Sequence, residues 1–305
     1  MRAMYQLGTM RLMCRFVVRG VLRFLPIAVG CLGTLNCSGG SYGAAPVTAP
    51  KPATPAAATA AAGSAITYQP VVNAAYVLHR LDSLTLHYPG GLEHQALERT
   101  AYLHLTLTDN AGGGYRATIV LDSLRASASA VPISTDSLAP LRGLRWTATV
   151  TPAGELSDLV ADRSTSLGDQ LANHLRLLFP VLPAAGARAG GRWADSMHFP
   201  LKTDAFDATE EASVSYRAAQ DLWSGGLKIE SKTKYQRAGM GTRFNQQLEM
   251  KASGQRDGAH YLGRNGVLLS AEGRESGTMT IKVPATGQTV PVDQSGRFEI
   301  RGSGR

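Results

Sequence analysis

Histidines, serines and paired carboxylates are the residues from which this 305-residue chain could build a metal or catalytic site. The seven histidines include no His-x-His pair and no His-Glu-x-x-His motif, two spacings that bring imidazoles onto one metal ion. His79 and His87 share one face of an expected strand, but eight residues of ~3.3 Å each separate them by about 26 Å. We therefore predict no metal site and no cofactor.

Serine and carboxylate chemistry is equally unsupported. The run Gly39-Gly40-Ser41-Tyr42-Gly43 lies in a low-complexity stretch, without the strand–turn–helix context of a nucleophile elbow. Glu210 and Glu211 follow Asp204 and Asp207, and we expect this acidic run to be a solvated loop between strands. We predict no catalytic residue and a non-enzymatic protein. A secreted hydrolase with a site built from scattered strand residues is the less favoured alternative.

Positive charge and cysteine are concentrated at the start of the chain. The net charge is +8, but residues 1–37 hold five arginines and no acid, so the remainder carries only +3. Such a surface is ordinary for a solvated protein, and we predict no nucleic-acid partner. All three cysteines also precede residue 38, so the body can form no disulfide and no thiolate site.

Residues 1–37 have the organisation of an export signal. A basic segment precedes an apolar, uncharged run at 24–36, which is shorter than the ~20 residues that a spanning helix needs. Cys37 follows a full apolar run and precedes a polar stretch, so we expect it to be the lipidated cysteine of a lipobox-like site. Cys31, with Gly30 before it, is the alternative, and plain cleavage near residue 43 stays open. The prediction is an exported protein of the cell envelope, periplasmic or on the outer face, anchored to a membrane through an N-terminal lipid.

Residues 38–65 are rich in alanine and proline and have few residues that could form a core. Such a composition cannot offset the conformational entropy lost on folding, so we expect a disordered tether. The tether would hold a folded body away from the membrane.

The body, residues 66–305, shows apolar and polar residues alternating with a period of two. We expect roughly ten to twelve strands, including 76–88, 100–108, 115–121 and 144–150, with a hairpin turn at 109–114. Four leucines at helical spacing predict one helix, with a capping box at 166–169 and an end at Pro180. The fold class is therefore mainly β (α+β minor). It is a single large curled antiparallel sheet with one amphipathic helix packed on its concave face.

Several motifs resemble those of a domain family of uncharacterised bacterial lipoproteins. They are Thr147-Ala-Thr-Val-Thr-Pro-Ala-Gly-Glu-Leu156, the leucine helix, Phe179-Pro180, Leu182-Pro183, Gly190-Gly191-Arg192-Trp193 and Gly266-Val-Leu-Leu-Ser-Ala-Glu-Gly273. The resemblance covers residues 68–275, although Gly191 and Arg192 replace the acidic residue and the serine usual before the tryptophan. The strand–helix–strand order also resembles, more distantly, the β-clamshell of periplasmic lipoprotein carriers and their receptors. That likeness implies an acyl chain held between sheet and helix, and no catalytic residue.

These observations predict a non-enzymatic envelope lipoprotein that binds an apolar ligand (a lipid or an acyl chain) or an envelope partner protein. The alternative is a structural or interaction lipoprotein with a closed core and no ligand. Lys228, Lys232 and Lys234 share the outer face of one strand and are expected to be solvated, or else to contact anionic head groups. The residues expected to line a ligand cavity are Leu84, Leu86, Leu103, Leu105, Trp146, Leu171 and Leu175.

Overall fold

The computed structural model describes residues 64–129, 133, 135–202, 206–243 and 245–302. The expected export signal, both candidate lipidation sites (Cys31 and Cys37) and residues 38–63 of the expected tether lie outside the described residues.

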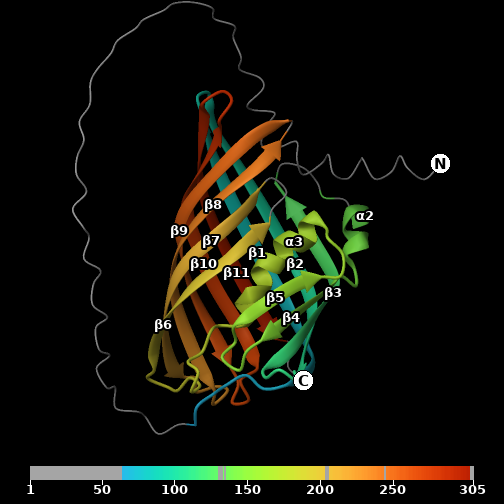
Figure 1. The fold of residues 1–305 in the computed structure, drawn as a ribbon, viewed down its shortest axis with the longest axis vertical. Helices are drawn as coiled ribbons and strands as arrows, with labels where there is room; N and C mark the ends of the chain where they lie inside the picture. The colour runs from blue at the N-terminus through green and yellow to red at the C-terminus, as the bar shows by residue number, and fades with distance from the viewer. Residues whose placement is uncertain (1–63, 130–132, 134, 203–205, 244, 303–305) are drawn as a thin grey trace, which may run out of the picture.

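The described chain is dominated by long strands, with two α-helices and two short 3₁₀ turns (Figure 1). The strands are β1 (Val71–Tyr88), β2 (Gly91–Asp109), β3 (Tyr115–Ala128), β4 (Arg145–Val150), β5 (Leu156–Ala161), β6 (Arg192–Lys202), β7 (Asp207–Gln220), β8 (Leu227–Arg243), β9 (Gln246–Leu262), β10 (Leu268–Val283) and β11 (Gln288–Gly302). The helices are α2 (Thr135–Leu138) and α3 (Ser166–Leu175), and the 3₁₀ turns are η2 (Ala139–Leu141) and η3 (Arg176–Leu178).

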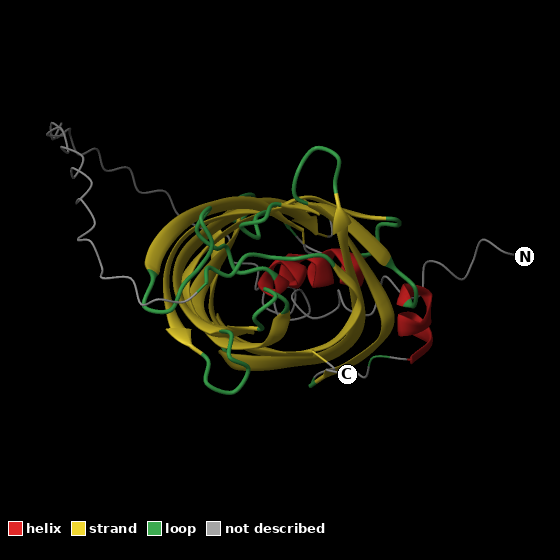
Figure 2. Cartoon of the chain, turned by 90° about the horizontal axis from the view of Figure 1, so that it is seen from below, coloured by secondary structure: helices red, strands yellow, loops and turns green. Residues whose placement is uncertain are grey.

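All eleven strands form one antiparallel sheet in the order β5-β4-β3-β2-β1-β11-β10-β9-β8-β7-β6. Strands that follow one another in the chain are paired, except β5 and β6, which form the two edges of the sheet. The pairing of β1 with β11 joins the first five strands to the last six. The sheet curls strongly, and α3 lies inside the curl, where it contacts both edge strands, β5 and β6 (Figure 2). The predicted mainly β fold, with one curled sheet and a helix on its concave face, is confirmed.

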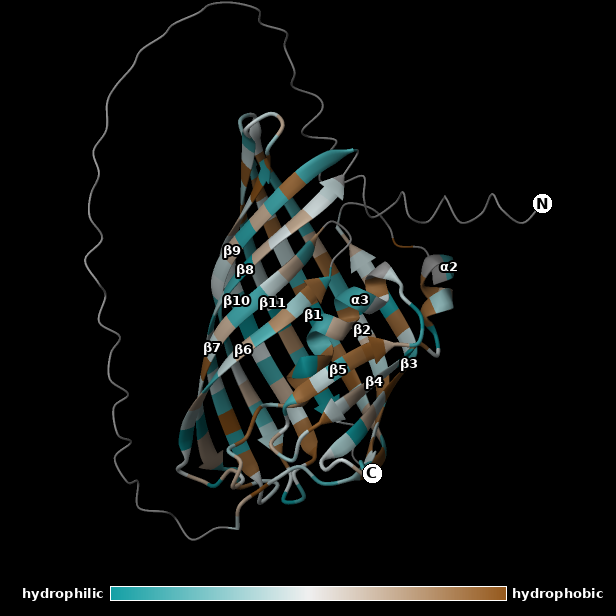
Figure 3. Cartoon of the chain, viewed as in Figure 1, coloured by the Kyte–Doolittle hydropathy of each residue, from teal (hydrophilic) through white to brown (hydrophobic). Residues whose placement is uncertain are grey.

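Alternation of side chains explains why these sequences form strands. Inward positions are apolar or buried along most strands and outward ones are polar, which appears as banding of each strand in Figure 3. The predicted hairpin between β2 and β3 is present, with Asp109 opposite Tyr115. Its turn uses Gly113 and Gly114 at φ of 89° and 72°, a region that favours glycine.

Helix α3 is shorter than the leucine spacing suggested and starts with a different cap. Thr165, rather than Ser166, is the N-cap, and its hydroxyl accepts a hydrogen bond from the Gly168 backbone N–H at 3.1 Å. The α-helix ends at Leu175 and tightens into η3 before Pro180, where proline prevents continuation. None of the helices in the described ranges has the length and apolar run needed to cross a membrane.

Candidate ligand cavity on the concave face

A cavity of about 460 Å³ lies on the concave face, between α3 and the end of the sheet that carries the β1–β2, β6–β7, β8–β9 and β10–β11 turns. Six neighbouring strands, β1 and β7 to β11, contribute to its wall, together with β2, β6 and α3. Sites for small molecules are typically ~300–1,000 Å³ in volume. The space is therefore large enough for one small molecule.

The wall near the turns is apolar. Its side chains belong to two small clusters that are separate from the main core of the protein. The apolar lining residues at this end are Leu84, Leu86, Phe199, Leu201, Phe206, Ala208, Met250, Ala252, Met279, Ile281 and Val292. Two residues of this set, Met250 and Met279, are methionines, whose flexible side chains adapt readily to an apolar guest.

A buried network of arginines and carboxylates crosses the middle of the cavity. Arg80 donates from Nε to Asp82 at 2.7 Å and lies 3.3 Å from Glu275 through Nη2. The register places Gly296 of β11 opposite both Asp82 and Glu275. A Cβ at Gly296 would sit 3.2 Å from the Arg80 guanidinium, so the glycine leaves room for Arg80 to reach from β1 across β11 to β10.

The network continues on the other side of Glu275. Arg237 donates to Glu210 at 2.6 Å and to Glu275 at 2.8 Å. Arg256 donates to Glu275 at 3.3 Å and lies 3.6 Å from Glu210. The Arg237 guanidinium also lies 4.2 Å from the centroid of the Tyr235 ring. Each of the two carboxylates is therefore shared by at least two arginines.

Arg99 ends the network next to α3. Its Nη2 donates to Asp82, and its Nη1 donates to Gln170 Oε1 at 3.3 Å. The same Nη2 lies 3.5 Å from His174 Nε2. Arg99 is only 7% exposed, and its Nε is buried without a hydrogen-bond partner in the described structure.

Burial and the arginines shift the pKa values of the groups around the cavity. Burial first, and then Arg80, Arg99, Arg256 and Arg237, lower the pKa of His174 well below its ordinary value. Burial also lowers the pKa of His260 to about 4, although its Nε2 donates to the Leu177 carbonyl at 3.1 Å. Both imidazoles are therefore neutral at pH 7.

The pKa of Glu275 is also lowered, but by its charged neighbours and against the effect of burial. Burial alone would raise its pKa, but Arg256, Arg237 and Arg80 outweigh burial and hold the pKa well below its usual range. Glu275 is therefore an anion at pH 7 and throughout the mildly acidic range.

The seven leucine and tryptophan positions predicted to line a cavity divide between two places. Leu84 and Leu86 lie in the cavity wall. The other five pack in the main core and do not line the cavity: Leu103, Leu105, Trp146, Leu171 and Leu175.

The sequence pattern does not predict the charged network, and it places one member, Glu210, in a solvated loop. The predicted acidic loop is wrong from Asp207 onward, since Asp207, Glu210 and Glu211 all lie within β7. Glu210 is fully buried and Glu211 faces solvent, while Asp204 lies outside the described residues. A usable signal exists in the sequence, because every member of the network occupies the inward parity of its strand. Arg80 and Asp82, for example, alternate in step with the buried Leu78 and Leu86.

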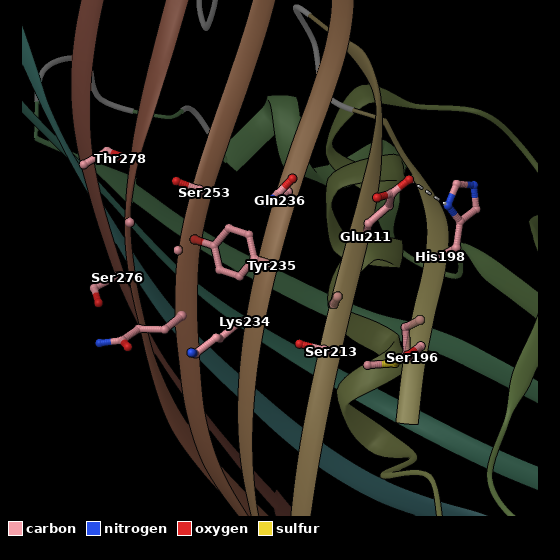
Figure 4. Close-up of a pocket in the computed structure, with 15 residues that line it drawn as sticks. Ser196, His198, Glu211, Ser213, Lys234, Tyr235, Gln236, Ser253, Ser276 and Thr278 are labelled. Atoms are coloured by element: carbon pink, nitrogen blue, oxygen red, sulfur yellow. Dashed lines mark ion pairs between the residues drawn. The ribbon is translucent and has the colours of Figure 1, made fainter. Parts of the chain in front are cut away.

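The convex face carries a second hollow, which is wide and open to solvent (Figure 4). It measures about 1060 Å³ and lies over short side chains such as Ser213, Ser253 and Ser276. His198 Nδ1 and Glu211 Oε1 face each other there at 3.8 Å, but both side chains are over 70% exposed. The three lysines of β8 also face outward, as their shared parity indicated, so this face is a solvated surface.

The described ranges contain no group of three or more histidine, cysteine, aspartate or glutamate side chains placed to hold a metal ion.

Comparisons with known proteins give distant structural matches only. The chain is similar to DynF from the dynemicin biosynthesis pathway of Micromonospora chersina, at 10% identity over 80% of this chain and 87% of that one, with a TM-score of 0.23. It is also similar to an outer membrane lipoprotein-sorting protein domain from Vibrio parahaemolyticus, at 10% identity over 75% and 83% of the two chains, with a TM-score of 0.16. A DUF1329 family protein from Desulfovibrio piger matches at 11% identity over 76% and 86%, also with a TM-score of 0.16. No protein-family description and no curated protein matches the chain.

Proposed function

We propose that the protein binds a single apolar or amphiphilic molecule, such as a lipid with one acyl chain, in the cavity on its concave face. The observation that carries this proposal is the apolar wall around Leu84, Leu86 and Ile281, which belongs to clusters separate from the main core. Binding of an apolar guest that covers such a surface is favourable, because it removes apolar area from water and adds dispersion contacts. The volume of about 460 Å³ suits one chain better than several.

The proposal is one of binding without catalysis. A general acid or base needs a pKa near the working pH and freedom to exchange its proton. Glu275 is instead held as an anion by three arginines. The side chain of Glu210 is fixed by ion pairs with two arginines. These carboxylates are better suited to fixing the positions of arginines than to transferring protons.

Titration with a fluorescent fatty acid tests the proposal. The wild type is compared with a variant in which a larger side chain replaces an alanine of the cavity wall and fills the cavity. Ala252 is 8% exposed and lies between Met279 and Arg237 in the sheet register. Ala252→Phe would place a ring in the space meant for the ligand and should weaken binding at least tenfold. Ala238→Phe adds the same ring on the solvent face of the adjacent strand and should leave binding unchanged. Equal binding by the two variants, or no binding by the wild type, would refute the proposal.

We further propose that the protein is exported to the cell envelope and anchored there through a lipid on Cys37. The support is the basic and apolar organisation of residues 1–37 and the alanine- and proline-rich stretch that follows. Incorporation of radiolabelled palmitate in a bacterial host, compared between Cys37→Ser and Cys31→Ser, tests the anchor. Loss of label in Cys37→Ser alone supports it, whereas loss in Cys31→Ser alone moves the anchor to the other cysteine. Labelling in neither the wild type nor the variants contradicts it.

A further inference from the structure

We propose that the cavity selects amphiphiles whose head is an anion, a carboxylate or a phosphate, and that Arg99 receives this head. The inference rests on the proposed function and adds the charge of the ligand and the place of its head.

The first support is an unbalanced charge inside the protein. Five arginines line the cavity, against three carboxylates, Asp82, Glu210 and Glu275. The fifth arginine, Arg176, donates to the Leu156 carbonyl and forms no ion pair with a described carboxylate. Both cavity histidines are neutral, so the described lining residues carry a surplus of two positive charges.

Buried charges are costly unless they are paired, and here each carboxylate is already shared. Asp82 forms ion pairs with Arg80 and Arg99, and Glu275 forms ion pairs with three arginines. Among the residues that the structure describes, no further carboxylate lines the cavity. An anionic group on a ligand would supply the missing negative charge.

The second support is a free donor at one end of the network. Two nitrogens of Arg99 are engaged by Asp82 and Gln170, whereas Nε has no partner although it is buried. An unsatisfied buried donor costs free energy, which a hydrogen bond to an anionic oxygen would recover.

The third support is the arrangement of polar and apolar walls along one strand. Asp82, Leu84 and Leu86 occupy successive inward positions on β1, each about 7 Å from the last. Arg99 reaches Asp82 from the adjacent strand β2, so a molecule with its head at Arg99 would lay its chain along Leu84 and Leu86 toward the turns. The polarity of the cavity therefore matches that of a single-chain amphiphile with a charged head.

Three ligands of equal chain length test the inference on the full-length protein: hexadecanoate, hexadecyl phosphate and hexadecanol. We expect at least one of the two anions to bind about tenfold or more tightly than the alcohol, because a hydrogen bond to a charged group is worth that factor. The tighter of the two anions identifies the head as a carboxylate or a phosphate. If the alcohol binds as tightly as both anions, the inference fails while the proposed function stands. If none of the three binds, the proposed function itself fails.

An isosteric substitution then tests the assignment to Arg99. Gln170→Glu puts a carboxylate against Arg99 Nη1 without changing the shape of the side chain. It should raise the melting temperature of the ligand-free protein, and it should weaken binding of the preferred anion about tenfold while affecting hexadecanol far less. Gln247→Glu, which adds the same charge at an exposed site on β9, is the control. An unchanged preference for anions in Gln170→Glu would overturn the assignment.

A second variant covers the case in which Gln170→Glu fails to fold. Arg99→Gln removes the proposed receiving group, and Arg125→Gln removes an exposed arginine from the facing strand β3. We expect the preference for anions to be lost in Arg99→Gln and kept in Arg125→Gln. An equal preference in the two variants would contradict the role of Arg99.

Discussion

The two ends of the concave face share strands β1, β2 and β6 to β11 but are filled differently. At one end, α3 and the strands around it form a dense core in which Trp146 and Leu103 are each 1% exposed. At the other end, Leu84, Met279 and their neighbours border an open space crossed by arginines and carboxylates. Helix α3 is ten residues long, whereas β1 is eighteen, so the helix cannot cover the whole concave face.

The difference shows how a sheet can keep a cavity. Apolar walls alone would tend to collapse onto each other, because close packing recovers dispersion energy. Arginines fixed by shared carboxylates cannot be covered by apolar side chains without loss of their hydrogen bonds. The charged network therefore separates the dense end from the hollow end.

The largest expected effect is at the dense end. Trp146→Ala should lower the free energy of unfolding by about 5 kcal/mol, because it leaves a large void in a fully packed region. Urea denaturation of the variant and the wild type measures this loss. Trp223→Ala, at a side chain that is 99% exposed, is the control and should change stability by less than about 0.5 kcal/mol. A small loss in Trp146→Ala would mean that this end is not densely packed.

The network that divides the two ends comes next. Glu275→Gln removes the charge shared by Arg80, Arg237 and Arg256, and it should destabilise the protein by about 4 kcal/mol by leaving buried cations without their partner. Glu272→Gln, on the solvent face of the same strand, is the matched control. Equal stabilities of the two variants would show that the network does not stabilise the fold.

Acid should weaken the protein over a defined range of pH. The pKa of His260 falls from an ordinary 6.5 to about 4 on folding, so between these values the unfolded chain binds a proton that the folded protein does not. Stability is therefore complete above about pH 6.5 and falls as the pH drops to 4, by about 3 kcal/mol for His260 alone. His174 acts in the same direction, and Glu275 adds a further loss below its usual pKa. Urea denaturation at pH 7, 5.5 and 4.5 measures the slope, and a flat profile would contradict the burial of both histidines.

The smallest effect is expected in the cavity wall. Met279→Ala should cost only about 1 kcal/mol, because its side chain already borders empty space and little packing is lost. The same substitution should weaken binding of a fluorescent fatty acid. A loss as large as that of Leu103→Ala in the dense core would show that the two ends are packed alike.

The sequence was a good guide to the sheet and a poor guide to the cavity. Strands, the side of the sheet that each residue faces and hairpin turns all depend on residues close together in the chain. The predicted turn after Asp109 is therefore confirmed. A cavity depends on what lies across the sheet, and the alternation of Leu103 is no different from that of Leu84. Only the position of α3 separates the packed leucine from the one that borders open space.

The charged network shows both what a single sequence conceals and what it contains. Arg99 lies in β2, far in the sequence from Arg256 in β9 and Glu275 in β10. Only the pairing of β1 with β11 brings these strands into one wall. Their inward parity, however, can be read strand by strand. A charged residue in step with buried apolar ones is the signal that would have identified them.

Native mass spectrometry of the protein purified from a bacterial host and incubated with bacterial lipid extract tests the central claim most directly. We predict a reproducible added mass corresponding to one single-chain amphiphile in the wild type and in Ala238→Phe. The added mass should be absent in Ala252→Phe, whose ring fills the cavity. A folded wild-type protein that carries no added mass, or a mass retained equally in both variants, would contradict ligand binding on the concave face.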